Sequence, residues 1–277
     1  QSNNVLLFVH QNPDGDTIGA ALAMGSLLKK LSKNVNVISP NKFPTFLSWM
    51  NGSEDIIIFS EHTDEVKIKI ENADMLIAMD FNAFNRVGSH LGNLLADSKK
   101  YKVIFDHHLE PEKGFDLYFS ITKTSSTSEI VYDVISKSKY YHLFDKEMAE
   151  NIYVGIMTDT GSFSYSCNNV STYNVVAELM SFNIDGEAIH RKVYDTYSEN
   201  RMRLLGLCLS ERLVVLPEYS ASYIYLSKAD LSKYCYQTGD SEGVVNYGLS
   251  IEKINFTALF TERENKFRFH KDFQDSL

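Results

Sequence analysis

A buried strand, a short polar turn and a helix follow one another over residues 5–31, and this segment constrains the fold more than any other. Residues 5–9 are continuously apolar, which predicts a short strand buried on both faces. Residues 17–31 repeat apolar side chains at helical spacing. A strand that runs through a tight turn into a helix is typical of a parallel α/β sheet.

The turn inside this segment carries one histidine and two carboxylates, His10, Asp14 and Asp16. Parallel α/β sheets bind their ligands at the carboxyl ends of the strands, and Gly15 lets the backbone bend sharply there. Imidazole and carboxylate donors suit divalent cations. Because Pro-Asp-Gly is also an ordinary turn sequence, the segment alone leaves a metal site and a plain turn both open.

Further apolar runs occur at residues 35–38, 56–59, 74–79 and 101–105, with helical or loop segments between them. This alternation predicts an α/β fold with a mainly parallel sheet flanked by helices. The character of the chain shifts near Glu199: residues 201–209 continue as a helix and short strands follow from Glu211, which predicts a second, smaller α+β domain. At 277 residues the chain exceeds the usual size of one domain. We therefore expect domains at residues 1–185 and 201–277, joined by a linker helix at residues 186–200.

Polar side chains gather where the apolar elements of the first domain end. These residues are Asp80, Asp106, His107, His108 and Asp159. Since strand ends meet at one edge of a parallel sheet, we expect them to lie near the polar turn that opens the chain. Each alone could be a cap, a surface group or a turn residue, but their joint occurrence favours a metal centre.

The charge and cysteine content limit the partners of the chain. With 27 basic and 36 acidic residues, its net charge of −9 argues against a broad basic surface for long nucleic acid. The three cysteines, Cys167, Cys208 and Cys235, have no paired spacing, which indicates free thiols in a reducing compartment. We find no long apolar segment and no signal peptide, and therefore expect a cytoplasmic protein with no membrane partner.

The motifs, taken in order, resemble those of the DHH phosphoesterases. They are His10-x-Asn12-Pro13-Asp14-Gly15-Asp16, then Asp80 with Arg86 and Gly88, then Asp106-His107-His108, and then Thr158-Asp159-Thr160-Gly161. Their order and separation match that family over about residues 4–185. The chain is most similar to its small nanoRNases and 3′,5′-bisphosphate nucleotide (pAp) phosphatases. Residues 201–277 would then be the DHH-associated, substrate-binding domain.

This resemblance implies two Mn²⁺ ions, with Mg²⁺ or Co²⁺ as alternatives. The ligands carried over are His10, Asp14 and Asp80 for the first ion, and Asp16, Asp80, His107 and Asp159 for the second, so that Asp80 bridges them. Two neighbouring cations can activate a water molecule and neutralise charge on the attacking and leaving oxygens. The resemblance also gives Asp106 the role of orienting a histidine, and leaves His108 free to contact the scissile phosphate or protonate a leaving oxygen.

Contacts with the substrate are predicted at five positions. Ser126, Thr127 and Ser128 resemble the family's substrate-facing Ser-Thr-rich stretch, and a helix N-terminus there would favour an anion, with simple helix capping as the alternative. Arg86 could pair with a phosphate or lie on the surface as an ordinary arginine. Arg268 is a further candidate. The family's C-terminal Gly-Gly-Gly-His signature has no counterpart, because no glycine follows Gly248; missing residues and a genuine truncation would both explain this, and no residue is assigned to it.

The sequence therefore predicts a two-metal phosphoesterase that hydrolyses short oligoribonucleotides, and the 3′-phosphate of pAp. A cyclic-dinucleotide (c-di-AMP) phosphodiesterase and an exopolyphosphatase or pyrophosphatase use the same first-domain motifs and stay open. A catalytically silent nucleotide sensor is the alternative from a different class, although it would predict the loss of a metal ligand. The partner expected is a short RNA or nucleotide, and the resemblance also suggests a homodimer.

Overall fold

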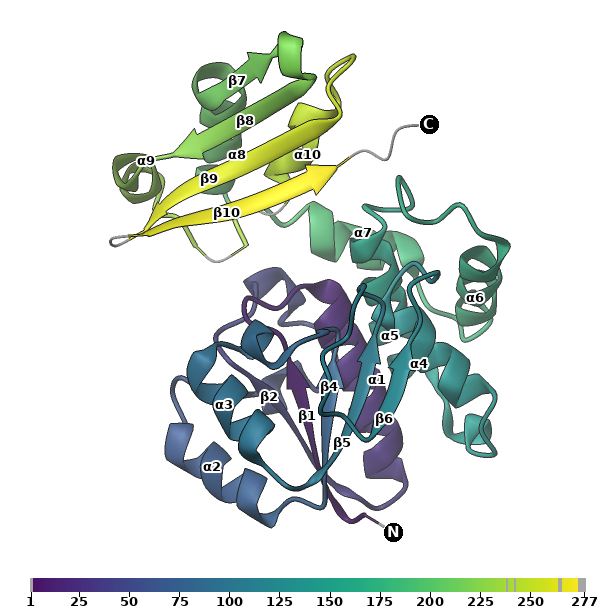
Figure 1. The fold of residues 1–277 in the computed structure, drawn as a ribbon. Coiled ribbons are helices and arrows are strands. Elements are labelled where there is room, and N and C mark those ends of the chain that lie inside the picture. Colours follow the sequence, from purple (N-terminus) through teal and green to yellow (C-terminus); the bar gives the residue numbers. More distant parts are fainter. Residues whose placement is uncertain (1, 238, 242, 264–265, 274–277) are drawn as a thin grey trace. The chain divides into compact units, whose positions relative to one another are not determined.

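The computed structural model describes residues 2–237, 239–241, 243–263 and 266–273, with side chains described through Glu262. The chain forms two compact units, residues 1–193 and 194–277 (Figure 1). The division falls within the range predicted as a linker helix, but that range holds all of α7 (Gly186–Tyr194) and the start of a second helix, α8 (Glu199–Leu207). A new helix starts because the Ser198 side chain accepts the Arg201 N–H and caps α8.

The first unit contains a six-stranded sheet in the order β3-β2-β1-β4-β5-β6, in which every neighbouring pair is parallel. The strands are β1 (Asn4–Val9), β2 (Asn34–Ser39), β3 (Ile57–Ile58), β4 (Met75–Met79), β5 (Tyr101–Asp106) and β6 (Leu117–Ser120). The predicted α/β class is thus confirmed. The apolar run at residues 56–59 gives only the two-residue β3, and the short edge strand β6 was not predicted.

Helices cover both faces of this sheet (Figure 1). Helices α2 (Thr63–Asn72) and α3 (Ser89–Asp97) lie on one face, and α1 (Gly15–Lys30) and α4 (Thr127–Ser136) lie on the other. Helix α5 (Lys146–Asp159) packs against α1 and α4, and α6 (Val170–Met180) packs against α5 and α4. Leu6 and Phe8 of β1 pack in one core with Val66 of α2 and Leu91 of α3. The residues between them on β1 are buried as well, because α1 and its neighbours cover the opposite face. Burial on both faces explains the continuous apolar run at the start of the chain.

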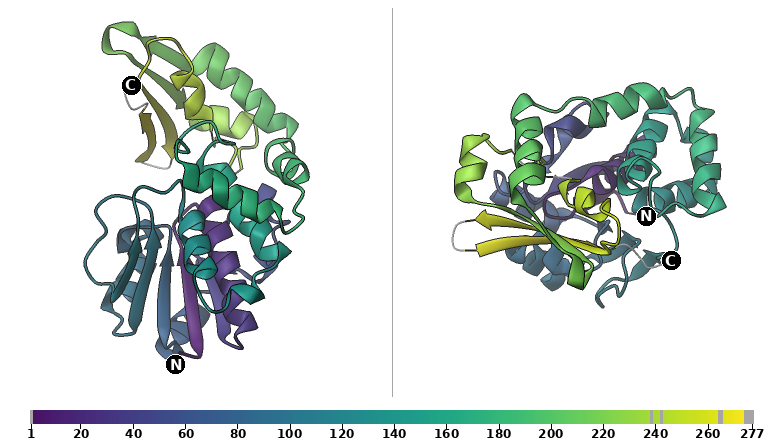
Figure 2. Two further views of the ribbon diagram at one scale, coloured as in Figure 1. Left: turned by 90° about the vertical axis from the view of Figure 1, so that its right-hand side faces the viewer. Right: turned by 90° about the horizontal axis from the view of Figure 1, so that it is seen from above.

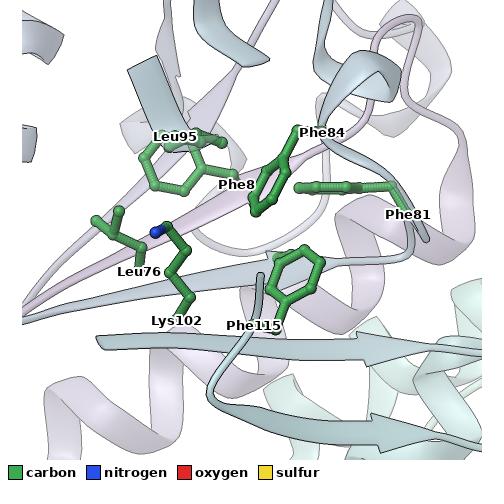
Figure 3. Close-up of a pocket in the computed structure, with 8 residues that line it drawn as sticks. Phe8, Leu76, Phe81, Phe84, Leu95, Lys102 and Phe115 are labelled. Atoms are coloured by element: carbon green, nitrogen blue, oxygen red, sulfur yellow. The ribbon is translucent and has the colours of Figure 1, made fainter. Parts of the chain in front are cut away.

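The core beneath α3 anchors the segment that follows β4. Phe81 and Phe84 insert among Phe8, Leu95 and Phe115 (Figure 3), and the rings of Phe84 and Phe115 stack with centroids 4.7 Å apart. The cavity among these side chains measures about 10 Å³, room for roughly one water molecule. It is therefore packed core and too small for a substrate, and it fixes the chain immediately after Asp80.

Helices α1 and α5 approach each other at backbone contact. A Cβ on Gly19 would lie 2.3 Å from the Asn151 carbonyl oxygen, and one on Gly15 would lie 2.4 Å from Thr158 Oγ1. Because these contacts pair the start of α1 with the end of α5, the two helices run in opposite directions. The close packing therefore places Asp159, the last residue of α5, beside the polar turn that precedes α1.

The second unit is a four-stranded sheet in the order β10-β9-β8-β7, with only the β8–β9 pair parallel. Its strands are β7 (Leu213–Leu216), β8 (Ala221–Leu226), β9 (Phe256–Arg263) and β10 (Lys266–Phe273), and its further helices are α9 (Lys228–Lys233) and α10 (Val244–Leu249). Side chains from α8 and α10 form a core with Ile224 and Leu259 on one face of the sheet (Figure 2). The predicted α+β class of this part is confirmed.

Two further sequence predictions can be compared with this structure. Cys167, Cys208 and Cys235 are all free thiols, as their spacing predicted. Within the described residues, none of the helices combines the length and the apolar character that crossing a membrane requires.

Two glycines of α1 offer a matched test of the contact with α5. Gly19→Ala should lower the free energy of unfolding by about 1–3 kcal/mol, because its methyl group meets a backbone oxygen that cannot move freely. Gly25→Ala should raise it by up to about 1 kcal/mol, since its methyl group would lie 3.7 Å from Val37 and a helical glycine is replaced. Denaturant unfolding followed by circular dichroism measures both, and equal effects would contradict this account of the packing.

Candidate metal centre

The carboxyl edge of the parallel sheet collects the polar residues that the sequence singled out. His10 follows β1, Asp80 follows β4, and Asp106 ends β5. Three overlapping groups have their potential ligand atoms within 4.8 Å of one another: His10, Asp14 and Asp80; Asp16, His107 and Asp159; and Asp80, His107 and His108. The structure thus brings all the predicted metal ligands into one cluster.

Asp80 lies between two histidines. Its Oδ2 is 3.5 Å from His10 Nε2, and its Oδ1 is 3.5 Å from His107 Nε2. The residue is only 2% exposed and has φ of +63°, in the left-handed region that aspartate tolerates better than most residues. Its N–H donates to the Phe105 carbonyl at 2.8 Å, so β5 supports this conformation. One carboxylate oxygen therefore faces His10 and the other faces His107, so that each oxygen belongs to a different group of potential metal ligands, called donor groups below.

The first donor group combines His10 with Asp14. Asp14 caps α1: its Oδ1 accepts the N–H groups of Asp16 and Thr17, and its Oδ2 lies 3.5 Å from His10 Nε2. Burial lowers the pKa of His10, but Asp14 and Asp80 outweigh it and raise this pKa to about 10. Burial raises the pKa of Asp14, yet His10 and the N–H groups at the cap lower it to about 2. A cation at this position would therefore displace a proton from His10.

The second donor group combines Asp16, His107 and Asp159, and His107 Nε2 lies 3.4 Å from Asp159 Oδ2. The pKa of Asp16 is raised well above its usual value, first by burial and then by the charge of Asp80. The pKa of Asp159 is raised likewise, by burial and then by Asp16 and Asp80. The cluster thus holds more negative charge than its protein surroundings balance, which is the situation that a divalent cation relieves.

The first turn of α4 donates hydrogen bonds to the carboxylates of Asp16 and Asp80. Asp16 accepts the N–H of Thr127 at 2.7 Å and the N–H of Ser128 at 2.8 Å, while Thr127 Oγ1 donates to Asp80 Oδ1 at 2.8 Å. Helix N-termini favour negative charge because their first N–H groups lack partners within the helix. Ser126 caps the helix by accepting the Glu129 N–H at 3.1 Å. The turn therefore fixes the orientation of two of the predicted ligands.

These contacts bear on the predicted substrate-binding stretch. Ser126, Thr127 and Ser128 are completely buried. Capping, which was the alternative interpretation, holds for Ser126, and the other two residues support the carboxylates. A direct contact between these residues and a substrate stays a prediction. The sequence offered no sign of the bonds to Asp16 and Asp80, because they join residues 47 to 112 positions apart.

Asp106 faces His108. Its Oδ1 is 2.8 Å from His108 Nδ1, and its Oδ2 accepts the His108 N–H at 3.1 Å. Burial lowers the pKa of His108, but the hydrogen bond to Asp106 and the charges of Asp80 and Asp106 outweigh this and raise it. Asp106 is fully buried, whereas the His108 side chain is 38% exposed. With Nδ1 engaged, the Nε2 atom is the part of His108 available for other contacts.

The two arginines predicted to contact the substrate lie in different units of the chain. Arg86 is exposed on the short helix η3 (Phe84–Val87), and its carbonyl accepts the Gln11 N–H at 2.7 Å. Its positive charge opposes protonation of His108 and is the smallest of the effects on the pKa of that imidazole. Arg268 belongs to β10, and its side chain lies outside the described residues.

Comparison with solved structures supports the assignment of the fold. A crystal structure of an exopolyphosphatase-related protein from Bacteroides fragilis superposes with a TM-score of 0.92 and 39% identity, over 99% of this chain and 80% of that one. A putative family II inorganic pyrophosphatase from Methanococcus jannaschii has a TM-score of 0.53 and 14% identity, over 93% of this chain and 83% of that one, and shows the fold alone.

Comparison of sequences identifies the family. The probable bifunctional oligoribonuclease and PAP phosphatase NrnA of Streptococcus mutans is 24% identical over 94% of this chain and 78% of its own length. The Bacillus subtilis bifunctional oligoribonuclease and PAP phosphatase NrnA is 23% identical over 96% of this chain and 80% of its own length. The profile of the N-terminal domain of the DHH family matches residues 4–156. The chain therefore belongs to the DHH family and is a metal-dependent phosphoesterase.

Proposed function

We propose that the protein is a two-metal phosphoesterase that hydrolyses short oligoribonucleotides to mononucleotides and removes the 3′-phosphate of pAp. The observation that carries this proposal is the position of Asp80, whose two oxygens each lie 3.5 Å from a different histidine. The first Mn²⁺ would be held by His10, Asp14 and Asp80. The second would be held by Asp16, Asp80, His107 and Asp159.

The donor set supports this assignment of two cations. The raised pKa values of Asp16 and Asp159 indicate uncompensated negative charge, and oxygen-rich ligands with imidazole suit Mn²⁺ better than sulfur-rich sets do. When bound, the two ions would lower the pKa of a water molecule and neutralise charge on the phosphate oxygens.

Residues around the donor set have roles of their own in this proposal. Asp106 fixes Nδ1 of His108, so that Nε2–H of His108 can donate its proton to the leaving oxygen as the P–O bond breaks. The exposed guanidinium of Arg86 can pair with a phosphate of the substrate. Residues 201–277 would form the DHH-associated, substrate-binding domain.

The substrate class is transferred from relatives. Those from S. mutans and B. subtilis are named as oligoribonuclease and PAP phosphatase, and each aligns with more than nine-tenths of this chain. The net charge of −9 favours a short substrate, because a few phosphates near bound cations need no extended basic groove. The similar B. fragilis structure is called exopolyphosphatase-related, which makes polyphosphate or pyrophosphate hydrolysis the second candidate.

Product analysis with a substrate panel tests the proposal. The protein with Mn²⁺ is incubated with di- to pentaribonucleotides, pAp, c-di-AMP, polyphosphate and pyrophosphate. We expect the short ribonucleotides to give mononucleotides fastest. Asp80→Asn should reduce this rate at least about 1,000-fold, because it weakens the group shared by both donor sets. Asp64→Asn is the control, since Asp64 is exposed on α2 and forms only a surface ion pair with Lys67 among the interactions described.

The other results of this panel have defined meanings. Preferential turnover of polyphosphate or pyrophosphate would favour the second candidate, and preference for c-di-AMP would reassign the substrate to cyclic dinucleotides. Binding of Mn²⁺ without turnover of any member of the panel would contradict the enzymatic proposal and favour a nucleotide sensor.

Thr127 offers a test of the support beneath Asp80. Thr127→Val preserves the shape of the side chain but removes the hydroxyl that donates to Asp80 Oδ1 at 2.8 Å. We expect Mn²⁺ binding to weaken about tenfold, as is usual when a partner of a ligating carboxylate is lost. Isothermal titration calorimetry measures the change. Thr124→Val, in the loop before α4, is the control, because that hydroxyl bonds only to backbone carbonyls among the contacts described. Wild-type affinity in Thr127→Val would rule out this role of Thr127.

A further inference from the structure

We propose that Glu129 is a positioning residue of the metal centre: it fixes the first turn of α4, whose N–H groups and hydroxyl orient Asp16 and Asp80. Glu129 contacts neither carboxylate in the bonds described, and it belongs to none of the three donor groups. The inference rests on the proposed function, because its readout is the affinity of that centre for Mn²⁺.

Glu129 is a buried carboxylate surrounded by hydrogen-bond donors. It is 3% exposed. Its Oε2 accepts the N–H of Ser125 at 3.0 Å, the hydroxyl of Ser125 at 2.7 Å and the hydroxyl of Thr172 at 2.8 Å. Its Oε1 accepts the hydroxyl of Ser171 at 2.7 Å. A group that only accepts hydrogen bonds matches four donors, so the site is built for a carboxylate.

These bonds close the turn that faces the metal ligands. The side chain of Glu129 reaches back to Ser125, while the backbone N–H of Glu129 donates to the Ser126 side chain at 3.1 Å. The turn between them contains Thr127 and Ser128, whose N–H groups bond to Asp16. Both ends of the turn are therefore fixed by Glu129, and the directions of the N–H groups inside it follow.

The same carboxylate reaches the segment that follows Asp159. Ser171 and Thr172 lie in the first turn of α6, and the Thr172 N–H donates to the N-cap residue Asn169 at 2.8 Å. Thr172 is completely buried. Through Glu129, the turn that orients Asp16 and Asp80 is thus bonded to the start of the helix that comes after Asp159.

A purely structural role for Glu129 makes a different prediction from a positioning role. A structural residue changes the free energy of unfolding but leaves the folded site unchanged. A positioning residue changes the affinity of the folded site, because ligating carboxylates tolerate little misorientation. The two roles are separated by measuring Mn²⁺ affinity well below the unfolding temperature of each variant.

The central variants are Glu129→Ala and Glu129→Gln. Alanine leaves the buried N–H and hydroxyl of Ser125 without their acceptor, and leaves the Thr172 hydroxyl only Asn169. We expect Mn²⁺ binding to weaken about 10- to 100-fold. Glutamine keeps an oxygen for Ser125 and Thr172, and its amide can donate to the Ser171 hydroxyl. It should therefore retain affinity within about threefold of the wild-type protein. Isothermal titration calorimetry gives the affinities, and electron paramagnetic resonance of the Mn²⁺-loaded proteins reports the arrangement of the ions.

Glu178→Ala is the matched control. Glu178 lies on α6 and accepts a hydrogen bond from the Tyr132 hydroxyl of α4, so it also links these two helices. That link lies beyond the first turn of α4 and contacts none of the metal-centre residues in the bonds described. We expect Glu178→Ala to lower the thermal midpoint of unfolding while leaving the Mn²⁺ affinity and the spectrum unchanged.

The outcomes separate this inference from the proposed function. Wild-type affinity and spectrum in Glu129→Ala, with only a lower unfolding midpoint, would overturn the inference alone. Failure of the wild-type protein to bind Mn²⁺ would overturn the proposed metal centre and the inference with it. If Glu129→Ala does not fold, Thr172→Val removes a single donor to Glu129, and an unchanged affinity in that variant would likewise overturn the inference.

Discussion

Electrostatic repulsion among the buried carboxylates Asp16 and Asp80 and the partly buried Asp159 is the constraint on which the candidate site depends. Burial and mutual repulsion raise the pKa of Asp16 and of Asp159, so the fold alone does not favour their full ionisation. The structure offsets part of this cost with hydrogen bonds to Asp16 and Asp80 from the first turn of α4. The remaining imbalance has the sign that a divalent cation corrects, which links the packing of the first unit to its function as a metal-dependent phosphoesterase.

Close packing of backbones brings these charges together. Gly15 and Gly19 let α1 meet α5 without intervening side chains, and a Cβ on Gly155 would lie 1.9 Å from Ser128 Oγ and 2.9 Å from Asp16 Oδ1. The glycine on α5 thus leaves space for the turn of α4 to reach Asp16. Thr17 Oγ1 donates to the Met79 carbonyl at 2.9 Å and fixes α1 against the end of β4. Small residues on two helices therefore determine the distances within the cluster as much as the ligands themselves do.

The sequence predicted the α/β class and the residues of the cluster because both follow from local patterns. Apolar runs mark buried strands, and polar residues at their carboxyl ends meet at one edge of a parallel sheet. The roles of Thr127 and Glu129 could not be predicted in this way, since the Thr127 N–H bonds to a residue 111 positions away and the Glu129 side chain to residues more than 40 positions away. The Ser-Thr stretch is equally suited by its sequence to capping and to substrate contact, and the structure shows capping at Ser126 and support of Asp16 and Asp80 by Thr127 and Ser128. The range 186–200, predicted as one linker helix, contains the side-chain cap at Ser198 that begins α8.

Hydrogen bonds within the protein orient the carboxylates of Asp14, Asp16 and Asp80 without help from a bound cation. Asp14 is oriented by the N–H groups at the start of α1, Asp16 by those of α4, and Asp80 by Thr127 and by the left-handed backbone that β5 supports. Because these three are already directed toward the histidines, cations entering the cluster need to displace protons rather than rebuild the site. Glu129 orders the turn that makes this preorganisation possible, while the four donors around it balance its own charge away from the cations. Asp14, Asp16 and Asp80 thus supply negative charge for the cations. Glu129, a separate carboxylate, keeps in place the turn that orients Asp16 and Asp80.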